Sequence, residues 1–306
     1  MGTLVFIKKK WFFVAIIILV VLSLSIIIDR DIKTKEVVEQ PLKIFDYSSF
    51  KDITAKSYCV YDILADKIIF AKDEHTHLPL ASVTKLMTAL IAKENLPQNT
   101  IIKIDLDAIK EEGDSGLLVG ERWGLKNLID FSLITSSNDG IQAIASAINN
   151  YSLIHSTSSE NTVSLMNKKA EDILLRDTVF LNETGLDIDK DLSGAYSSAY
   201  DITHLLAYII KNNPSLISDT VLEKTSYNSD DKIKHEAKNT NTYINKIPQI
   251  LASKTGFTDL AGGNLAIVFD AGFMHPVAVV ALGSTEDGRF TDVENLVKLT
   301  LQKLSE

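Results

Sequence analysis

Three short polar motifs hold the groups that a serine-based acyl-transfer reaction needs. They supply hydroxyl, amine and amide groups in one order along the chain: Ser82 and Lys85, then Ser136 and Asn138, then Lys254, Thr255 and Gly256. A serine hydroxyl is a weak nucleophile until a base removes its proton, and an amine can act as that base when burial or a neighbouring cation keeps it partly neutral. The ordered set therefore predicts a lysine-activated serine nucleophile.

The first motif predicts the nucleophile and its base. Residues 84–94 carry apolar side chains at helical spacing, and Pro97 follows them. Ser82 would lie at the start of this helix, with Lys85 one turn later and within reach of the serine oxygen. Lys254 is the expected second cation. Free N–H groups at a helix start can stabilise an oxyanion, so the Ser82 N–H is one predicted donor, and the strand carrying Lys254 should supply the other.

The other two motifs predict groups that handle the substrate's ends. Ser136 and Asn138 fall on a turn between two helical segments, where short polar side chains can project into a cleft. Ser136 could pass a proton to the leaving amine, while Asn138 could bind the substrate's amide carbonyl and hold Lys85 in place. Thr255 offers a hydroxyl to a terminal carboxylate, and Gly256 lets the substrate backbone lie close to the strand. We therefore expect a substrate with an anionic end group.

A single copy of one of these motifs is weak evidence, because the chain contains further matches to the same patterns, here called decoys. Ser-x-x-Lys recurs at 48–51, and Ser-x-Asn recurs at 159–161 and 226–228. The first decoy lies in a polar stretch with no helical pattern after it, and the other two lie in segments predicted to be loops. Lys-Thr-Gly occurs once. Order and context therefore select the set given above.

The elements that must position these motifs follow from hydrophobic periodicity. Strands and a helix packed on them are expected at 58–62, 68–71, 264–269, 277–282 and 293–304. Helices are expected between them at 125–134, 141–148, 163–175 and 200–210, and loops at 151–160 and 226–245. The two ends of the folded chain would then share one sheet, and its middle would be mostly helical.

The amino terminus is predicted to lie at a membrane. Lysines at 8–10 precede an almost uninterrupted apolar run at 11–28, which as a helix would rise about 27 Å, close to the thickness of a bilayer core. A retained single-pass anchor is favoured over a cleavable export signal, because three isoleucines follow the only small-residue site at 23–25. The expected divisions of the chain are 1–10, a short cytoplasmic end; 11–28, the transmembrane anchor; 29–54, a polar tether; and 55–306, an extracytoplasmic catalytic domain.

Charge and cysteine content exclude several classes of function. A net charge of −9 leaves no basic surface of the size that nucleic acids require, so no nucleic-acid partner is expected. The single Cys59 excludes an internal disulfide and cysteine-rich metal sites, and we expect it to fill space in a strand. His75 and His77 raise a metallopeptidase as an alternative, but without a third ligand nearby they are expected to be surface residues. No metal and no cofactor are expected.

Five stretches of the chain carry a pattern that extends beyond the three motifs. They are residues 80–90, 166–170, 180–187, 239–241 and 254–262. In these stretches the chain resembles the low-molecular-mass penicillin-binding proteins, the serine-type D-alanyl-D-alanine carboxypeptidases. The three ordered motifs belong to the same pattern.

This resemblance implies both a fold and a reaction. The implied fold is β-lactamase/transpeptidase-like, an α/β (α+β) arrangement of an antiparallel sheet flanked by helices, with a mostly helical lobe and the site between them. The implied substrate is the peptidoglycan stem pentapeptide, which would lose its terminal D-alanine through an acyl-enzyme on Ser82. β-Lactam antibiotics would be captured covalently at the same serine. By analogy, the Phe257 N–H would be the second oxyanion donor.

The resemblance has three departures. Ser137 stands where the carboxypeptidases usually have glycine, and Ala252-Ser253 replaces the usual glycine ahead of the Lys-Thr-Gly strand. An additional β domain and a carboxy-terminal amphipathic anchor, which some relatives carry, are not expected here. None of these departures removes a group assigned to the chemistry.

Other interpretations stay open. A DD-endopeptidase that cuts peptidoglycan crosslinks would use the same groups, since sequence does not resolve cleft shape. A class A β-lactamase shares the three motifs and needs a carboxylate to clear its acyl-enzyme; Glu183 superficially fits, although 183–187 also matches the carboxypeptidase pattern. From another class, an inactive module that binds wall peptides would fail to react covalently with a fluorescent penicillin.

Overall fold

The computed structural model describes residues 50, 52–155 and 160–306. The predicted cytoplasmic end at 1–10, the anchor at 11–28 and nearly all of the tether at 29–54 lie outside these described residues. Within the described part of the chain, none of the helices is both long enough and apolar enough to cross a bilayer.

The folded domain includes residues that the sequence analysis assigned to the tether. Ile53 is buried, and the backbone N and Oγ1 of Thr54 donate hydrogen bonds of 2.9 and 2.8 Å to Asp292. Asp292 is fully buried in α8 (Gly288–Leu304) and also accepts a 2.6 Å bond from Ser284 Oγ. A buried carboxylate on a distant helix therefore fixes the chain at this point, which local polarity could not predict.

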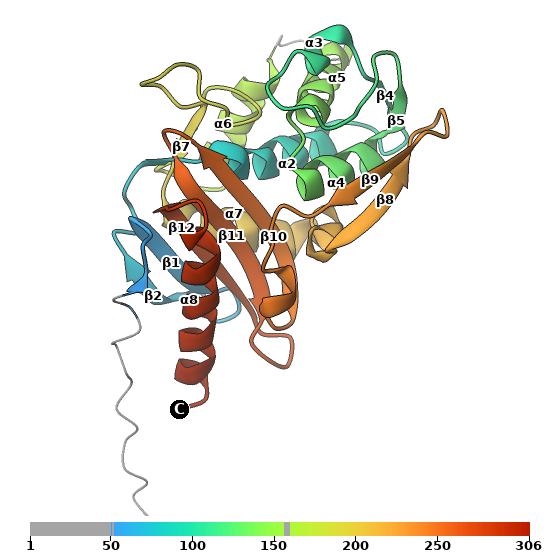
Figure 1. Cartoon of the computed structure of the whole chain (residues 1–306). Helices are drawn as coiled ribbons and strands as arrows, with labels where there is room; N and C mark the ends of the chain where they lie inside the picture. Colours follow the sequence, from blue (N-terminus) through green and yellow to red (C-terminus); the bar gives the residue numbers. More distant parts are fainter. Residues whose placement is uncertain (1–49, 51, 156–159) are drawn as a thin grey trace, which may run out of the picture. The chain divides into compact units, whose positions relative to one another are not determined.

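A five-stranded antiparallel sheet joins the two ends of the described chain (Figure 1). Its strands, in spatial order, are β10 (Ile250–Thr258), β11 (Gly262–Asp270), β12 (Pro276–Ser284), β1 (Ser57–Asp62) and β2 (Lys67–Lys72). Pairing of β1 with β12 confirms the prediction that early and late strands share a sheet. Cys59 is buried within β1, as expected.

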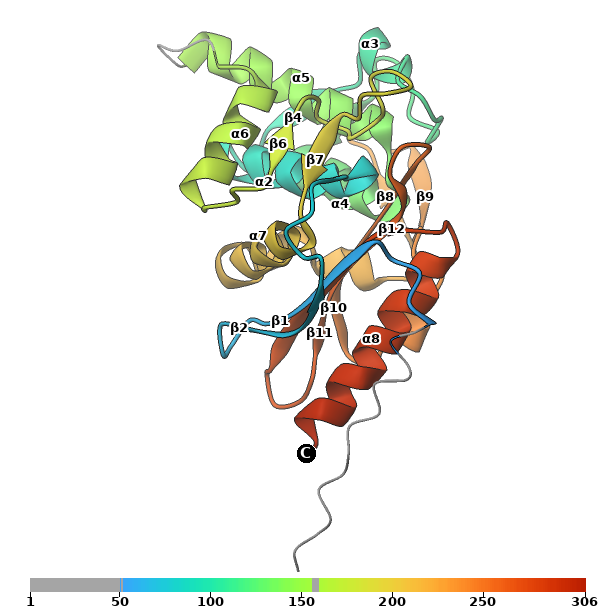
Figure 2. The same cartoon turned by 90° about the vertical axis from the view of Figure 1, so that its left-hand side faces the viewer.

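Side chains that alternate between the two faces of the sheet create two hydrophobic cores. In β11, Leu265, Ile267 and Phe269 belong to the core beneath α8, whereas Ala266 and Val268 face the opposite core. That second core includes α7 (Ala199–Asn212), so the sheet lies between one helix on each face (Figure 2). α7 begins at an N-cap serine whose Oγ accepts the N–H three residues on.

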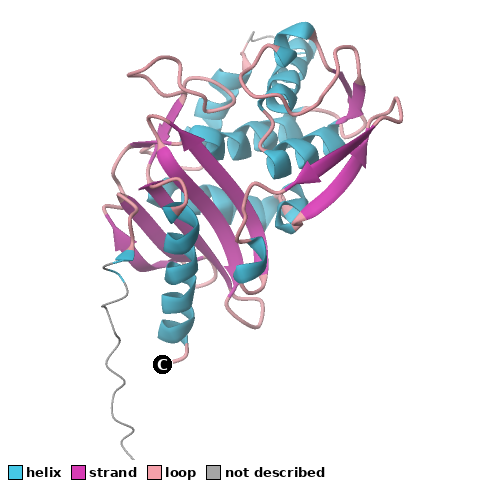
Figure 3. Cartoon of the chain, in the orientation of Figure 1, coloured by secondary structure: helices cyan, strands magenta, loops and turns pink. Residues whose placement is uncertain are grey.

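The middle of the chain forms a mostly helical lobe beside the sheet (Figure 3). Its helices are α2 (Lys85–Asn95), α3 (Leu106–Ile109), α4 (Leu125–Thr135), α5 (Asn138–His155) and α6 (Thr162–Asp172). α2 packs against α4, α5 and α6 and is buried along most of its length. The predicted helices are confirmed, but α5 and α8 begin earlier than their apolar periods indicate, and α5 also covers part of the predicted loop at 151–160.

Short elements connect the sheet and the lobe. They are the 3-10 turns η2 (Ala81–Thr84), η3 (Pro214–Leu216), η4 (Ser218–Val221) and η5 (Ile244–Lys246), and the strand groups β3 (Leu78–Pro79) with β7 (Ala195–Ser197) and β6 (Val179–Phe180), β4 (Ile101–Lys103) with β5 (Arg122–Gly124), and β8 (Lys224–Asn228) with β9 (Lys234–Lys238).

The loop predicted at 226–245 was wrong in its first half. The β8–β9 hairpin occupies that half, and only His235 and Ala237 of β9 turn inward and are buried. Because one of the two inward residues is polar, the strand lacks the apolar alternation on which strand prediction depends. The antiparallel sheet and flanking helices of the predicted fold are present.

Candidate active site

Ser82 and Lys85 meet where the chain enters α2. Ser82 lies in η2 and Lys85 is the first residue of α2, so the two side chains are one turn apart. Lys85 Nζ donates hydrogen bonds to Ser82 Oγ at 2.6 Å and to the backbone oxygen of Thr184 at 3.0 Å. Ala81, just before the serine, has a φ of 48°, a left-handed conformation that is uncommon for a residue with a side chain.

The environment of Lys85 favours the neutral amine. The side chain is fully buried, and burial lowers the pKa of Lys85 to about 7, although the negative charge of Glu111 opposes the shift. An amine with that pKa is substantially neutral near pH 7 and can accept a proton. The geometry and charge of the pair therefore suit a serine nucleophile and its base.

Lys254 enters the same site from the sheet. It lies on β10, is almost fully buried, and its Nζ donates to Ser136 Oγ at 2.9 Å and to the backbone oxygen of Thr255 at 2.8 Å. Burial lowers the pKa of Lys254 well below its ordinary value, and the charges of Lys85 and Arg289 lower it further. The two lysines are therefore close enough to influence each other's protonation.

The second motif forms the turn between α4 and α5. Ser136 ends α4 in the left-handed conformation, with a φ of 59°, and this directs its hydroxyl to Lys254. Asn138 begins α5, and its Nδ2 donates to the backbone oxygen of Glu112 at 2.5 Å. The prediction that Asn138 holds Lys85 was wrong, because the bonds of that amine go to Ser82 and Thr184. Among the described residues, Asn138 Oδ1 is buried and has no donor bonded to it.

Gly256 allows β10 to lie against the serine turn. A Cβ on this glycine would lie 2.8 Å from the backbone oxygen of Leu80 and 3.2 Å from the backbone nitrogen of Ser82. The Ser82 amide and the strand after Lys254 are thus adjacent, which is the arrangement expected of two oxyanion donors. Any larger residue at 256 would force them apart.

Two further polar side chains adjoin the third motif. Thr255 is buried, and its Oγ1 lies 2.5 Å from Thr240 Oγ1. Arg289, from the start of α8, donates through Nη1 to the backbone oxygen of Gly256 at 2.9 Å, while its buried Nε has no acceptor within residues 50, 52–155 and 160–306. Sequence reasoning missed Arg289, because the predicted helix began after it, and noted Thr240 only within a family pattern.

A sequence profile described as D-alanyl-D-alanine carboxypeptidase (peptidase S11) matches residues 44–285. The chain belongs to this carboxypeptidase family. It is 31% identical over 250 residues to D-alanyl-D-alanine carboxypeptidase DacF of Bacillus subtilis, covering 79% of this chain and 61% of the relative. It is 29% identical over 219 residues to the D-alanyl-D-alanine endopeptidase of Pseudomonas aeruginosa, covering 69% of this chain and 66% of that protein. The chain therefore spans just under two thirds of these curated relatives' lengths.

Solved structures support the same family. Penicillin binding protein 5 from Haemophilus influenzae is similar with a TM-score of 0.68 at 25% sequence identity, over 83% of this chain and 71% of that one. The resemblance to low-molecular-mass penicillin-binding proteins, predicted from the five stretches, is confirmed. Their mixed fold of antiparallel sheet and helices is also that of the described domain.

The departures from the carboxypeptidase pattern are accommodated locally. Ser137 is buried, its Oγ accepts the Gly140 N–H at 2.8 Å, and Ser115 Oγ lies 2.6 Å away. This hydroxyl joins the turn of the second motif to the loop before β5. Ser253, on β10 just ahead of the Lys-Thr-Gly run, accepts a 2.9 Å bond from Nδ2 of Asn241 in the connection after β9. Both serines therefore have bonded hydroxyls in this family member.

The decoy motifs lie apart from this site or outside the described residues. The pair at 226–228 lies in β8, and Asn161 caps α6 by accepting the Ser164 N–H. Residues 48, 49, 51 and 159 lie outside the described chain, so the decoy at 48–51 is not described apart from Phe50. Order and context thus selected motifs that meet in space.

Four of the six histidines lie beside carboxylates. His75 Nδ1 lies 2.9 Å and His77 Nε2 3.5 Å from Asp177, and both imidazoles are exposed. No group of three or more metal-ligating side chains occurs among residues 50, 52–155 and 160–306. His235 is buried, with Nε2 at 2.7 Å from Glu121. That pair joins β9 to the loop before β5.

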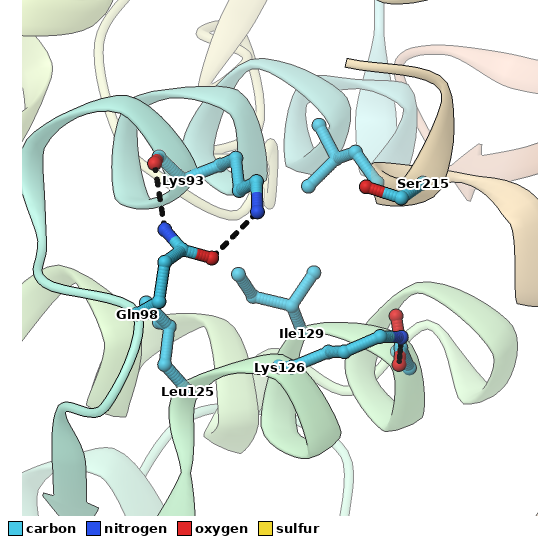
Figure 4. A pocket seen from close by; sticks show the side chains of 8 residues that line it. Lys93, Gln98, Leu125, Lys126, Ile129 and Ser215 are labelled. Atoms are coloured by element: carbon cyan, nitrogen blue, oxygen red, sulfur yellow. Dashed lines mark hydrogen bonds and ion pairs between the residues drawn. The ribbon is translucent and has the colours of Figure 1, made fainter.

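A small cavity elsewhere in the lobe is too small for a peptide. It measures about 30 Å³, and Figure 4 shows Lys93 and Gln98 on one side, hydrogen-bonded to each other, with Ile129 and Ser215 across from them. This volume holds about one or two water molecules. None of the motif residues lines it.

Proposed function

We propose that this protein is a serine-type D-alanyl-D-alanine carboxypeptidase, which removes the terminal D-alanine from peptidoglycan stem pentapeptides. One observation carries the proposal: Lys85 Nζ lies 2.6 Å from Ser82 Oγ in a buried site that lowers the pKa of the lysine to about 7. The family match, and the carboxypeptidase activity that names the Bacillus subtilis relative, support it.

Acylation uses the first two motifs. Lys85 takes the hydroxyl proton as Ser82 Oγ bonds to the carbonyl carbon between the two terminal D-alanines. The N–H groups of Ser82 and Phe257 stabilise the oxyanion of the tetrahedral intermediate. The C–N bond then breaks, and the proton that Lys85 took is passed through Ser136 to the departing amine, which restores neutral Lys85 and the Ser136 hydroxyl. Free D-alanine leaves, and the stem peptide remains as an ester on Ser82.

Deacylation completes the cycle. A water molecule gives a proton to neutral Lys85 and attacks the ester carbon, and the serine oxygen leaves with the proton that the lysine holds. The tetrapeptide is released with a new carboxylate, and Ser82 regains its hydroxyl. Lys85 thus acts as the base when the serine or the water attacks, and as the acid when the serine oxygen leaves.

Substrate binding relies on the third motif. The Thr255 hydroxyl binds the terminal carboxylate, with positive potential supplied by Arg289 behind the strand. Asn138 Oδ1, to which no donor is bonded in the described part of the chain, accepts a substrate N–H. Its Nδ2, assigned in the sequence analysis to the amide carbonyl, already donates to the backbone oxygen of Glu112. Gly256 keeps the strand edge close enough for a substrate backbone to lie along it.

β-Lactam antibiotics are the proposed covalent inhibitors of this site. The strained β-lactam carbonyl acylates Ser82 as the peptide does, but the amine released by ring opening stays attached to the acyl group. It cannot diffuse away as D-alanine does, so access of water is restricted. The similar structure from Haemophilus influenzae has a penicillin-binding protein's name, which supports this partner.

Two assays test the proposal. Intact-mass measurement after incubation with a defined pentapeptide should show loss of one D-alanine, and a fluorescent penicillin should label the wild-type chain. Ser82→Ala should abolish both signals, whereas Ser226→Ala, in a decoy motif on β8, should change neither. Label that persists on Ser82→Ala would assign the nucleophile elsewhere.

A DD-endopeptidase is the second candidate. The specific observation is the 29% identity to the D-alanyl-D-alanine endopeptidase of Pseudomonas aeruginosa. Both reactions acylate Ser82, but the endopeptidase expels the side-chain amine of a second stem peptide. A crosslinked dimer and a pentapeptide offered together, with products weighed, separate the two. The third candidate, a class A β-lactamase using Glu183, would release the fluorescent penicillin quickly, whereas the carboxypeptidase retains it.

The proposed location is the outer side of a bacterial cell membrane, where peptidoglycan lies. The apolar run at 11–28 would be the single-pass anchor, and 29–49 would join it to the described domain. Extraction of membranes at alkaline pH tests this, because a spanning chain stays in the membrane pellet. A chain lacking 1–28 should appear in the supernatant.

A further inference from the structure

Two neighbouring turns at one end of the sheet present an exposed apolar tip, defined here as Leu64, Phe273 and Met274. Their exposed fractions are 69%, 106% and 85%. Leu64 lies in the turn between β1 and β2, and the other two lie in the turn between β11 and β12. Full exposure of a phenylalanine beside a methionine is costly in water, because neither side chain gains by hydration.

The larger turn is held open by specific hydrogen bonds. Asp270 Oδ1 accepts the N–H groups of Gly272 at 2.9 Å and His275 at 2.8 Å, and Ala271 N donates to the His275 oxygen at 2.9 Å. Phe273 and Met274 have φ values of 56° and 61°, which residues with large side chains rarely adopt. The turn therefore projects two large apolar side chains where glycine or asparagine would suit the backbone better.

A buried carboxylate brings the two turns together. Asp62, the last residue of β1, accepts the N–H groups of Leu64 at 3.1 Å and Ala65 at 2.8 Å through Oδ1. Its other oxygen lies 2.8 Å from His275 Nε2, and Ile63 N donates to the Pro276 oxygen at 3.1 Å. One side chain thus fixes the turn of Leu64 beside the turn of Phe273.

We propose that the apolar tip inserts into the surface of a lipid membrane. The three side chains expose on the order of 500 Å² together, which is less than the roughly 800 Å² that each partner buries in a standard protein interface. They protrude from two narrow turns, whereas a protein partner needs a broad complementary surface. A bilayer interface accepts protruding apolar side chains without a matching shape.

The chain outside the described structure supplies the reason for a membrane to be near. An apolar run at 11–28 and a polar stretch at 29–49 precede Phe50, whose ring packs on Tyr58 near the start of β1. The polar stretch can reach up to about 70 Å, whereas β1 spans only about 20 Å from that point to the tip. Tethering raises the local concentration of lipid, so a small apolar contact suffices to orient the domain.

Docking by this tip would direct the active site away from the bilayer. In β11, Gly263 pairs with Phe257 beside the site, and Asp270 at the other end adjoins the tip. Nine residues of strand separate the ends by about 30 Å, and Figures 1 and 2 show the β11–β12 turn at the end of the sheet away from α2. The membrane-facing tip and the substrate-facing site thus occupy opposite ends of one rigid sheet.

A nitroxide placed at the tip tests the proposal in the full chain. The chain is reconstituted into vesicles of phosphatidylethanolamine and phosphatidylglycerol, with Met274→Cys labelled in one sample and Lys190→Cys in the other. Lys190 is the matched control, since its side chain is 89% exposed. Native Cys59 is buried, and burial raises the pKa of its thiol to about 12, so it does not react. Thermal unfolding monitored by circular dichroism confirms that each labelled chain is folded.

The readout is the ratio of two collision rates of the nitroxide: its rate with oxygen, which concentrates in lipid, divided by its rate with a nickel chelate, which stays in water. The ratio at 274 should be several-fold higher than at 190, and adding Leu64→Ser and Phe273→Ser should return it to the value at 190. A ratio at 274 equal to that at 190 overturns the proposal. Shielding of 274 from both reagents also overturns it, because that result indicates contact with protein or with a second copy.

The wild-type chain gives a second measurement without any substitution. Vesicles that carry a lipid with a photoreactive group in its acyl chain are irradiated, and the modified peptides are mapped. Adducts on the peptide containing 271–275 are expected. Adducts confined to 11–28 would overturn the proposal, whatever the outcome of the carboxypeptidase assays.

Discussion

Replacing Gly256 by alanine tests whether β10 must lie against the nucleophile. The added Cβ would lie 2.8 Å from the Leu80 oxygen and 3.2 Å from the Ser82 nitrogen, whereas ordinary contacts to a Cβ begin at 3.4 Å. Both neighbours are backbone atoms, which cannot rotate away as a side chain would. The strand and the serine turn must therefore separate by about half an ångström, since packed interiors offer little free space.

That separation acts on the geometry of acylation more than on the fold. Misplacing reacting groups by 1 Å costs about 10²-fold in rate, and losing one oxyanion donor costs about 10²- to 10³-fold. We expect Gly256→Ala to lower the second-order rate constant for acylation by a fluorescent penicillin by about 10²-fold. Overpacking should also reduce the free energy of unfolding by about 1–3 kcal/mol, with secondary structure unchanged.

The assay follows label intensity against time at several penicillin concentrations, with intact mass confirming a single adduct. Gly124→Ala is the matched control, because its Cβ would meet only Asp230 Oδ1, at 3.9 Å, and its φ of −64° suits alanine. The control should react like the wild type. If Gly256→Ala also acylates at the wild-type rate, the close approach of β10 to Ser82 has no part in the reaction.

Three further changes test the base, the carboxylate site and the fold. Acylation should accelerate as pH rises through about 7, because neutral Lys85 accepts the proton and its pKa is about 7. A wild-type rate that does not change with pH would contradict this assignment. Lys85→Ala should abolish acylation while the circular dichroism spectrum stays unchanged. Thr255→Val should impair substrates with a free terminal carboxylate more than their amides, and equal losses would refute its role. Asp292→Asn disturbs three buried or partly buried hydrogen bonds and should cost about 1–3 kcal/mol in urea unfolding, without slowing acylation; unchanged stability would show that the carboxylate is dispensable.

Sequence predicted best those features that depend on pattern within one segment. Apolar periodicity located α2 and the paired strands β1 and β12, since burial on one face repeats every two or 3.6 residues. The order of the three motifs then identified Ser82, Lys85 and Lys254 as groups that would meet. These residues carry their chemistry in their side chains, so their types alone indicate what they can do.

Features that depend on backbone atoms or distant packing could not be predicted. The acceptor that holds Lys85 is the Thr184 carbonyl, which every residue type possesses and which therefore leaves no signal in the sequence. Gly185 explains why that carbonyl can be there: its φ is 79°, and a Cβ would lie 1.9 Å from the Ala81 oxygen. The sequence analysis assigned Asn138 to Lys85. Its Nδ2 instead donates to the backbone oxygen of Glu112, and sequence reasoning gave no sign that the loop with Glu112 would lie there.

The two lysines cannot both be charged at low energetic cost, and this constrains the path of the proton. Each is buried, and the charge of Lys85 lowers the pKa of Lys254, so protonation of one disfavours protonation of the other. When Lys85 takes the Ser82 proton, the site therefore favours transfer of a proton to the substrate over a state in which both lysines are charged. Ser136 is bonded to Lys254 at 2.9 Å and ends a rigid helix, so it is positioned to deliver a proton to the departing amine. Removal of the Ser136 hydroxyl should then slow amine expulsion from a peptide more than acylation by a β-lactam, whose ring strain assists the departure of its amine.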